Sequence, residues 1–145
     1  MRLSKRTEYG MQAIIQLARH WPHNFLRAQQ LAQDEGISNK FLESILLALR
    51  RGGFLESKIG RDGGYRLARA PKDIRVGDVI RRLEGRLTLK DGSSTEECSP
   101  GEVAVHLLND KLTQAIDEVL DQMTLEQLLD HVNRAGGVQH QMYYI

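Results

Sequence analysis

Residues 54–70 read FLESKIGRDGGYRLARA, two short strand-like runs on either side of a turn that contains three glycines. Such runs around a glycine-rich turn are typical of a β-hairpin. Lys58, Arg61 and Arg66 lie on or beside the turn. These cations indicate that the hairpin contacts a polyanion. The alternative is that it is only a structural corner of the fold.

Two predicted helices joined by a short turn precede the hairpin. The first covers residues 27–35 and is followed by Gly36, a residue suited to the left-handed turn that ends a helix. The second is capped by Ser38 and ends at Gly52 and Gly53. Its expected apolar stripe consists of Phe41, Leu42, Ile45, Leu46 and Leu49. The pair has the outline of a helix-turn-helix.

A further helix is expected at each end of this unit. Residues 3–21 have apolar side chains at helical spacing, with Ser4 as the N-cap and Pro22 closing the helix. Residues 74–85 form a predicted fourth helix. Three helices followed by a basic hairpin make a winged helix, in which the third helix enters the major groove and the hairpin touches backbone or minor groove. The fold class is therefore mainly α with a small β-hairpin.

A long helix is predicted after a polar connecting loop at residues 86–99. Ser99 and Glu102 form a capping box and Pro100 occupies the first helical position. The apolar stripe contains Val105, Leu108, Leu112, Ile116 and Val119. A stripe this wide needs two partners, so we expect a homodimer through this helix.

The chain then ends in a short helix and a tail. Thr124 and Gln127 predict a capping box that opens a helix over residues 125–132. The tail from Asn133 has too little periodicity for a prediction. We thus expect a DNA-binding domain at 1–85, the loop at 86–99, dimerisation helices at 100–132 and a C-terminal tail at 133–145.

Charge divides the chain in two. Residues 1–90 hold 18 Lys and Arg against 9 Asp and Glu, whereas residues 91–145 hold 2 against 10. A basic module is a candidate for nucleic acid, because phosphate neutralisation supplies affinity that does not depend on sequence. The alternative is an ordinary solvated surface with unevenly spread charge. With one cysteine, no leader and no long apolar run, we expect a soluble cytoplasmic protein with no membrane contact.

The chain resembles the Rrf-two family of bacterial winged-helix transcriptional regulators. The matching stretches are MRLS at the start, Tyr9-Gly10, GISNKFLE at 36–43, LRRGGFLES at 49–57, GRDGGYRLARAP at 60–71, IRVGDVIRRLEG at 74–85 and TLEQLL at 124–129. The resemblance implies a cytoplasmic dimer, most often a repressor, that binds partly palindromic double-stranded operator DNA.

The residues expected to meet DNA fall into two groups. Base edges are expected to face Ser38, Asn39, Lys40, Glu43 and Ser44, with Glu43 reading a cytosine amino group. The alternative for Glu43 is a solvated helix residue near Arg50. Backbone positioning is assigned to Arg2, Tyr9, Arg27, Arg50, Arg61 and the amides of Gly63 and Gly64. Tyr65 is either a DNA contact or a packing residue.

The number of cysteines bears on whether this chain binds the iron–sulfur cluster found in some members of the family, and Cys98 is the one cysteine in the sequence. Cluster-binding members supply three closely spaced cysteines to an iron–sulfur centre, whereas this chain has one. Glu8 and His106 are the other candidate ligands, and the three together would make a weak site, so no cofactor is expected. Cys98 is otherwise a hydrophobic staple that packs on Val103, or a redox-sensitive thiol.

Enzymatic and metal-binding functions are disfavoured. Cys98 and His106 lie about 12 Å apart along one helix, too far for a nucleophile and its base. The pair His20 and His23 flanks a proline and has no further His or Cys nearby. Three hypotheses remain: a DNA-binding repressor that responds to a small molecule, a protein partner or nothing; a redox or iron–sulfur-responsive regulator; and a winged helix used as a protein-interaction module.

Overall fold

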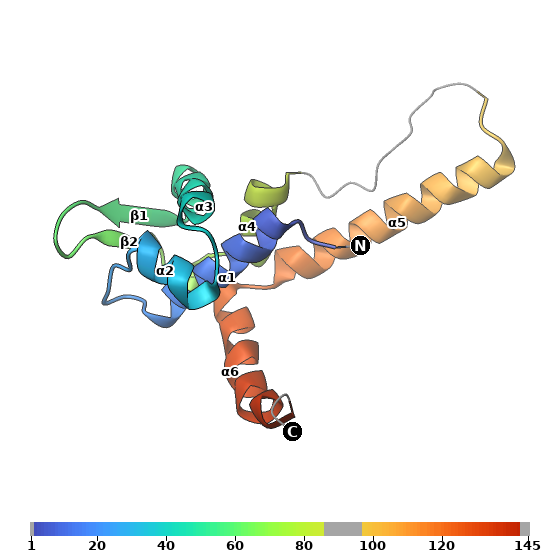
Figure 1. The fold of residues 1–145 in the computed structure, drawn as a ribbon. Coiled ribbons are helices and arrows are strands. Elements are labelled where there is room, and N and C mark those ends of the chain that lie inside the picture. Colours follow the sequence, from blue (N-terminus) through green and yellow to red (C-terminus); the bar gives the residue numbers. More distant parts are fainter. Residues whose placement is uncertain (1, 86–96, 143–145) are drawn as a thin grey trace.

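Four helices (α1–α4) and a hairpin form the N-terminal part of the structure, and two further helices extend from it (Figure 1). The structure is a computed structural model that describes residues 2–85 and 97–142. The elements are α1 (Lys5–Arg19), α2 (Ala28–Glu35), α3 (Asn39–Arg51), β1 (Leu55–Lys58), β2 (Gly64–Leu67), the short 3-10 turn η1 (Pro71–Asp73), α4 (Val76–Glu84), α5 (Pro100–Gln122) and α6 (Leu125–Met142). Most of the predicted connecting loop, residues 86–96, lies outside the described residues.

The predicted helix caps are present. The hydroxyl of Ser4 accepts a hydrogen bond from the Thr7 amide, and that of Ser38 accepts one from the Phe41 amide, both at 3.2 Å. Gly36 ends α2 in the left-handed conformation, with φ of 66°. Because these caps satisfy backbone groups that the helix itself leaves open, the boundaries near them follow from local chemistry.

The core lies between α1, α3, α4 and the hairpin. The predicted stripe of α3 is confirmed at Leu42, Ile45, Leu46 and Leu49, all completely buried. The prediction that Phe41 belongs to the buried stripe was wrong, since 37% of the residue is exposed. Its ring contacts Tyr9 edge-on, at a centroid distance of 5.7 Å. It lies at the edge of the stripe, where α1 covers only one of its sides.

The hairpin is antiparallel, with Leu55 opposite Leu67 and Lys58 opposite Gly64. Leu26 joins β2 as a third, single-residue strand through two 2.8 Å hydrogen bonds with Tyr65. A side chain at Gly64 would lie 2.4 Å from the Leu26 carbonyl oxygen, so glycine is required where these two backbones meet. The hairpin is therefore fixed to the segment that leads into α2.

α4 connects α3 to α5. Arg82 Nε donates to the Ala48 carbonyl in α3 at 2.9 Å. On the other side, Arg81 binds Asp121 at 2.7 Å and Asp117 at 3.1 Å in α5, and these hydrogen bonds raise the pKa of Arg81. α4 therefore contacts α3 on one side and holds α5 in position on the other.

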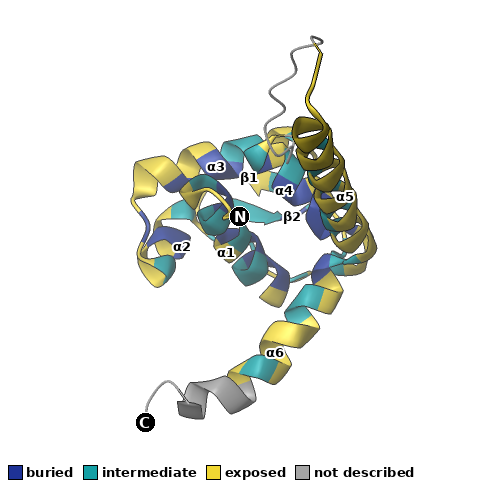
Figure 2. Ribbon diagram, turned by 90° about the vertical axis from the view of Figure 1, so that its right-hand side faces the viewer, coloured by how far each residue is buried: buried dark blue, intermediate teal, exposed yellow. Residues whose placement is uncertain are grey.

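α5 leaves the body of the molecule, and its whole length is exposed or half-buried (Figures 1 and 2). Its predicted start at Pro100 and its capping box are confirmed, as is the capping box of Thr124 and Gln127 that opens α6. α6 runs to Met142, well past the predicted end at residue 132.

The start of α6 packs on the N-terminal domain, a contact that was not predicted. Leu125 is completely buried in the core of the winged-helix domain and Leu129 packs against that core. The Leu125 amide also donates to the Ile74 carbonyl at 2.8 Å. The first turns of α6 therefore complete the N-terminal domain, because their apolar side chains find their partner on α1 and not on the long helix.

Glu84, the last residue of α4, joins α4 to the start of α1. Its carboxylate accepts hydrogen bonds from the Ser4 amide at 3.2 Å, from the Ser4 hydroxyl at 2.7 Å and from the buried Thr7 hydroxyl. The Thr7 bond, followed by those of Ser4, lowers the pKa of Glu84. The charged form is therefore the one that stabilises this junction.

We expect Glu84→Gln to lower the free energy of unfolding by about 1 kcal/mol at pH 7, a figure reduced for the partial exposure of the carboxylate. Because the pKa is lower in the folded state, this stabilisation is present above the unfolded pKa and is lost as the pH falls through the folded pKa. Urea denaturation at pH 7 and at about pH 3 measures it, with exposed Asp34→Asn as the control. An equal difference between wild type and E84Q at both pH values would contradict the assignment.

Candidate nucleic-acid interface

The N-terminal half of α3 presents polar side chains to solvent. Ser38, Asn39, Lys40, Glu43 and Ser44 are all exposed, on the side of the helix opposite the buried leucines. Figure 2 shows this division along α3. The Ser44 hydroxyl donates to the Phe41 carbonyl at 2.8 Å, which leaves its lone pairs for a further donor. Five exposed polar groups on one helix end can meet the edges of bases in a major groove.

Glu43 stands out in this group because it is an acid on a basic domain. The salt bridges within the described ranges 2–85 and 97–136 do not include Glu43, so it is an exposed helix residue without an ion pair to Arg50, and its contact with a base stays a prediction. Arg50 lies in the last turn of α3, at the other end of the helix. The carboxylate is thus available to accept a hydrogen bond from outside the chain.

The hairpin tip is basic and its backbone is braced. Arg61 is exposed, and its carbonyl accepts a hydrogen bond from Arg27 Nη2. The Gly63 amide donates to the Gly60 carbonyl at 3.1 Å and closes the turn. This is a correction, since the predicted phosphate contact of that amide is replaced by a hydrogen bond within the hairpin. Tyr65 is half-buried against the core, in agreement with the packing alternative.

A cleft of about 770 Å³ lies between the hairpin and the loop from α1 to α2. Its walls include Arg27, Lys58, Arg61, Arg66 and two histidines, and Asp62 is the one carboxylate among the described residues that line it. Arg66 lies over the Phe25 ring at 4.3 Å and Lys58 at 5.8 Å. This contact of two cations with an aromatic ring could not be predicted from the sequence, because Phe25 and Lys58 come together only when the loop packs on the hairpin.

The remaining predicted contacts lie near the start of α1. Arg2 is exposed just before the Ser4 cap, and half-buried Tyr9 packs on Phe41 with Lys5 5.8 Å above its ring. Lys5 is also held by Glu8 at 2.9 Å, and this hydrogen bond raises the pKa of Lys5. The start of α1 and the start of α3 are therefore neighbours, so their exposed cations belong to one surface.

α5 carries the second candidate surface. It has 23 residues and none of them is buried, although it holds Val103, Val105, Leu107, Leu108, Leu112 and Val119 as exposed large apolar side chains. Leu112, Ala115, Ile116, Val119 and Leu120 line an apolar groove of about 280 Å³. Contiguous apolar surface of this kind marks a contact with another molecule.

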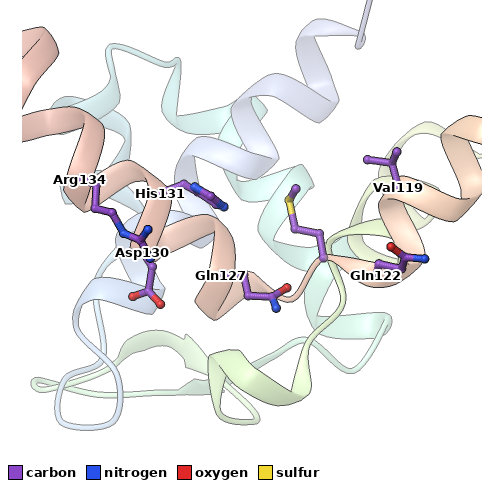
Figure 3. Close-up of a pocket in the computed structure, with 7 residues that line it drawn as sticks. Val119, Gln122, Gln127, Asp130, His131 and Arg134 are labelled. Atoms are coloured by element: carbon purple, nitrogen blue, oxygen red, sulfur yellow. The ribbon is translucent and has the colours of Figure 1, made fainter.

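A polar hollow adjoins this face where α5 meets α6 (Figure 3). It measures about 480 Å³ and is lined by Val119, Gln122, Met123, Gln127, Asp130, His131 and Arg134. Val119 belongs both to the hollow and to the predicted dimer stripe. A second chain seated on α5 would therefore form part of its wall.

The candidate cluster ligands are not gathered into a metal site. Cys98 is exposed before the α5 cap, Glu8 binds Lys5 on α1, and His106 is half-buried on α5. Within residues 2–85 and 97–136, no three His, Cys, Asp or Glu side chains are placed to hold a metal ion. Val103 is 44% exposed, so the staple between it and Cys98 stays a prediction.

Comparison with known proteins places this arrangement in a family. Residues 3–131 match Rrf2, described as iron-dependent transcriptional regulator. The chain belongs to the Rrf2 family. Over its full length it is 32% identical to the whole of the HTH-type transcriptional regulator CymR of Bacillus subtilis. It is also 32% identical to NsrR of Bacillus licheniformis, with 92% of this chain and 98% of that protein aligned.

Solved structures of Rrf2 regulators have the same fold. CymR, the global cysteine regulator of B. subtilis, superimposes with a TM-score of 0.79 at 32% identity over 90% of this chain and 98% of that one. T. potens IscR gives 0.78 at 35% identity over 99% and 97%. The predicted winged helix and family are thereby confirmed, and these relatives are regulators of transcription. None of the helices among the described residues has the length and apolarity needed to cross a membrane.

Proposed function

We propose that this Rrf2 protein is a sequence-specific DNA-binding repressor that acts as a homodimer on a partly palindromic operator. The observation that carries the proposal is the division of α3. Its buried side fixes the helix to the core, and its other side exposes Asn39, Lys40 and Glu43. The backbone contacts assigned to Arg2, Tyr9, Arg27, Arg50 and Arg61 position this helix on the duplex.

The homodimer is supported by α5. A helix without buried residues gains little from its own domain, and burying one large aliphatic side chain contributes about 1.5–3 kcal/mol. A second α5 on the stripe of Val105, Leu108, Leu112, Ile116 and Val119 would cover this surface. Two-fold symmetry would then present two copies of α3 to half-sites about 34 Å apart.

Binding-site selection from random duplexes tests the proposal. The purified protein is expected to enrich an inverted repeat, and the enriched duplex should bind about 10³-fold or more tightly than bulk DNA at physiological salt. Recovery of no common sequence would overturn the proposed function and would leave a protein-interaction module as the alternative.

Glu43→Gln is expected to relax specificity at one position of each half-site. A glutamate accepts a hydrogen bond from the cytosine amino group, whereas an amide can also pair with adenine, so discrimination should fall about tenfold at that base pair. Competition between the selected operator and single-base variants measures it. Ser57→Ala, on the hairpin outside α3, is the control. Unchanged discrimination by E43Q at every position would remove Glu43 from base recognition.

We further propose that the protein has no resident iron–sulfur cluster. Such clusters are held mainly by several cysteine thiolates, and a homodimer of this chain offers only one Cys98 from each subunit. Protein purified without air is expected to lack visible absorption and stoichiometric iron. A coloured protein that loses its iron in the Cys98→Ala variant would contradict this and would support the redox or iron-responsive alternative.

A further inference from the structure

Ile59 is an apolar residue whose side chain is exposed to solvent. It is 99% exposed, at the end of β1 on the hairpin tip. In the described part of the chain, the other exposed large apolar residues outside α5 and α6 are Leu3 and Phe41, each 37% exposed. Ile59 therefore gives nothing to the core and does not belong to the α5 dimer face.

The tip holds Ile59 in a fixed place. Lys58 pairs with Gly64 in the last rung of the hairpin, and the turn is closed by the hydrogen bond from Gly63 to Gly60. The bond from Arg27 to the Arg61 carbonyl braces the other side of the turn. A β-branched side chain also has little rotational freedom. A protruding group on such a support loses little entropy when it is inserted into a partner.

The surroundings of Ile59 indicate the chemistry of the partner. Lys58 precedes it and Arg61 follows two residues later, both exposed. Glycine occupies positions 60, 63 and 64, so the tip is slender around one apolar side chain. Apolar residues flanked by cations are used by proteins that open the DNA minor groove, where the cations meet the phosphates on the groove walls and the apolar group wedges between base steps.

We propose that Ile59 is a specificity-determining residue that wedges into the minor groove next to the base pairs read by α3. The inference rests on the proposed operator binding and goes beyond it. A wedge unstacks a base step, and pyrimidine–purine steps unstack most easily. Ile59 therefore selects for such steps at positions that no hydrogen-bonding side chain reads, and it bends the duplex toward the major groove.

The test repeats binding-site selection with the full-length wild type, Ile59→Ala, Ile59→Val and Arg61→Ala. I59A is expected to recover the same half-site core but to lose the enrichment of TA or CA/TG steps at the hairpin positions. Its affinity for the wild-type operator should fall about tenfold with an unchanged salt slope, because no charge is removed. I59V keeps a branched apolar group and should stay within about threefold of wild type. R61A should instead lower the salt slope by about one.

Electrophoresis of circularly permuted operator fragments gives an independent reading of the bend. I59A should bend the operator less than wild type and I59V. Because Ile59 is 99% exposed, I59A and I59V should both have the wild-type melting temperature. I59A could instead match the wild type in operator affinity, in the sequence selected beside the half-site and in the DNA bend. That result would overturn the proposal that Ile59 is a wedge and would leave the proposed function intact. If wild type itself selects no sequence, the proposed function fails and the wedge with it.

Discussion

Leu112→Glu is expected to convert the dimer to monomers and to lower operator affinity by about 100-fold. The reason is that a dimer bound to two half-sites has an affinity higher by about this factor than a monomer bound to one. Leu112 lies in the middle of the apolar stripe, is 44% exposed in the single chain and lines the groove on α5. Its replacement places an unpaired carboxylate in the predicted contact, where burial of a charge is costly.

Sedimentation equilibrium and operator titration measure the two effects. The chain should still fold, since α5 has no buried residue to disturb. Gln114→Glu is the matched control. It adds the same charge to the same helix at an exposed position about 200° around from Leu112, so it should leave the dimer intact. A dimeric L112E protein with wild-type affinity would show that another surface joins the subunits.

The double replacement Lys40→Ala with Arg61→Ala should also weaken operator binding by about 100-fold, since each lost contact costs roughly 1–3 kcal/mol. Lys40 lies on the exposed end of α3 and Arg61 on the hairpin tip, so the variant removes one cation from each proposed DNA-contacting element. The slope of log affinity against log salt should become shallower by about two, because the duplex loses two cations that neutralise its charge and keeps the counterions that these cations would displace.

The control removes the same charge elsewhere. Arg19 ends α1 and Lys72 lies in η1, and both are exposed. The Arg19→Ala, Lys72→Ala protein should keep its affinity within about threefold, as expected when only distant, screened charges are lost. Equal losses in the two double variants would mean that the protein's overall charge, and not α3 and the hairpin, attracts DNA.

The sequence predicted those parts of the fold that depend on local chemistry. Caps at Ser4, Ser38 and Ser99 and the stripe of Leu42, Ile45 and Leu49 involve residues within one or two turns of one another, so spacing alone identifies them. The position of α6 depends on packing across the chain. Leu125 packs beside α1, and this contact could not be predicted from the residues near Leu125 in the sequence.

The candidate site shows the same division. Exposure of Asn39, Lys40 and Glu43 follows from the helical period and was predictable. The use of the Gly63 amide within the turn and the stacking of Arg66 on Phe25 were not, because each depends on how a loop closes in three dimensions. The exposure of Ile59 was likewise hidden, since alternation in a strand does not say which face lacks a neighbour.

If α5 holds two copies of α3 at a fixed separation on one face of the DNA, operator affinity must depend on the spacing between the two half-sites. Operators with five base pairs inserted between the selected half-sites turn the second half-site to the opposite side of the duplex. We expect one dimer to bind the selected operator and the insertion to lower affinity about 100-fold, to that of a single half-site. Equal affinity for both operators would contradict it.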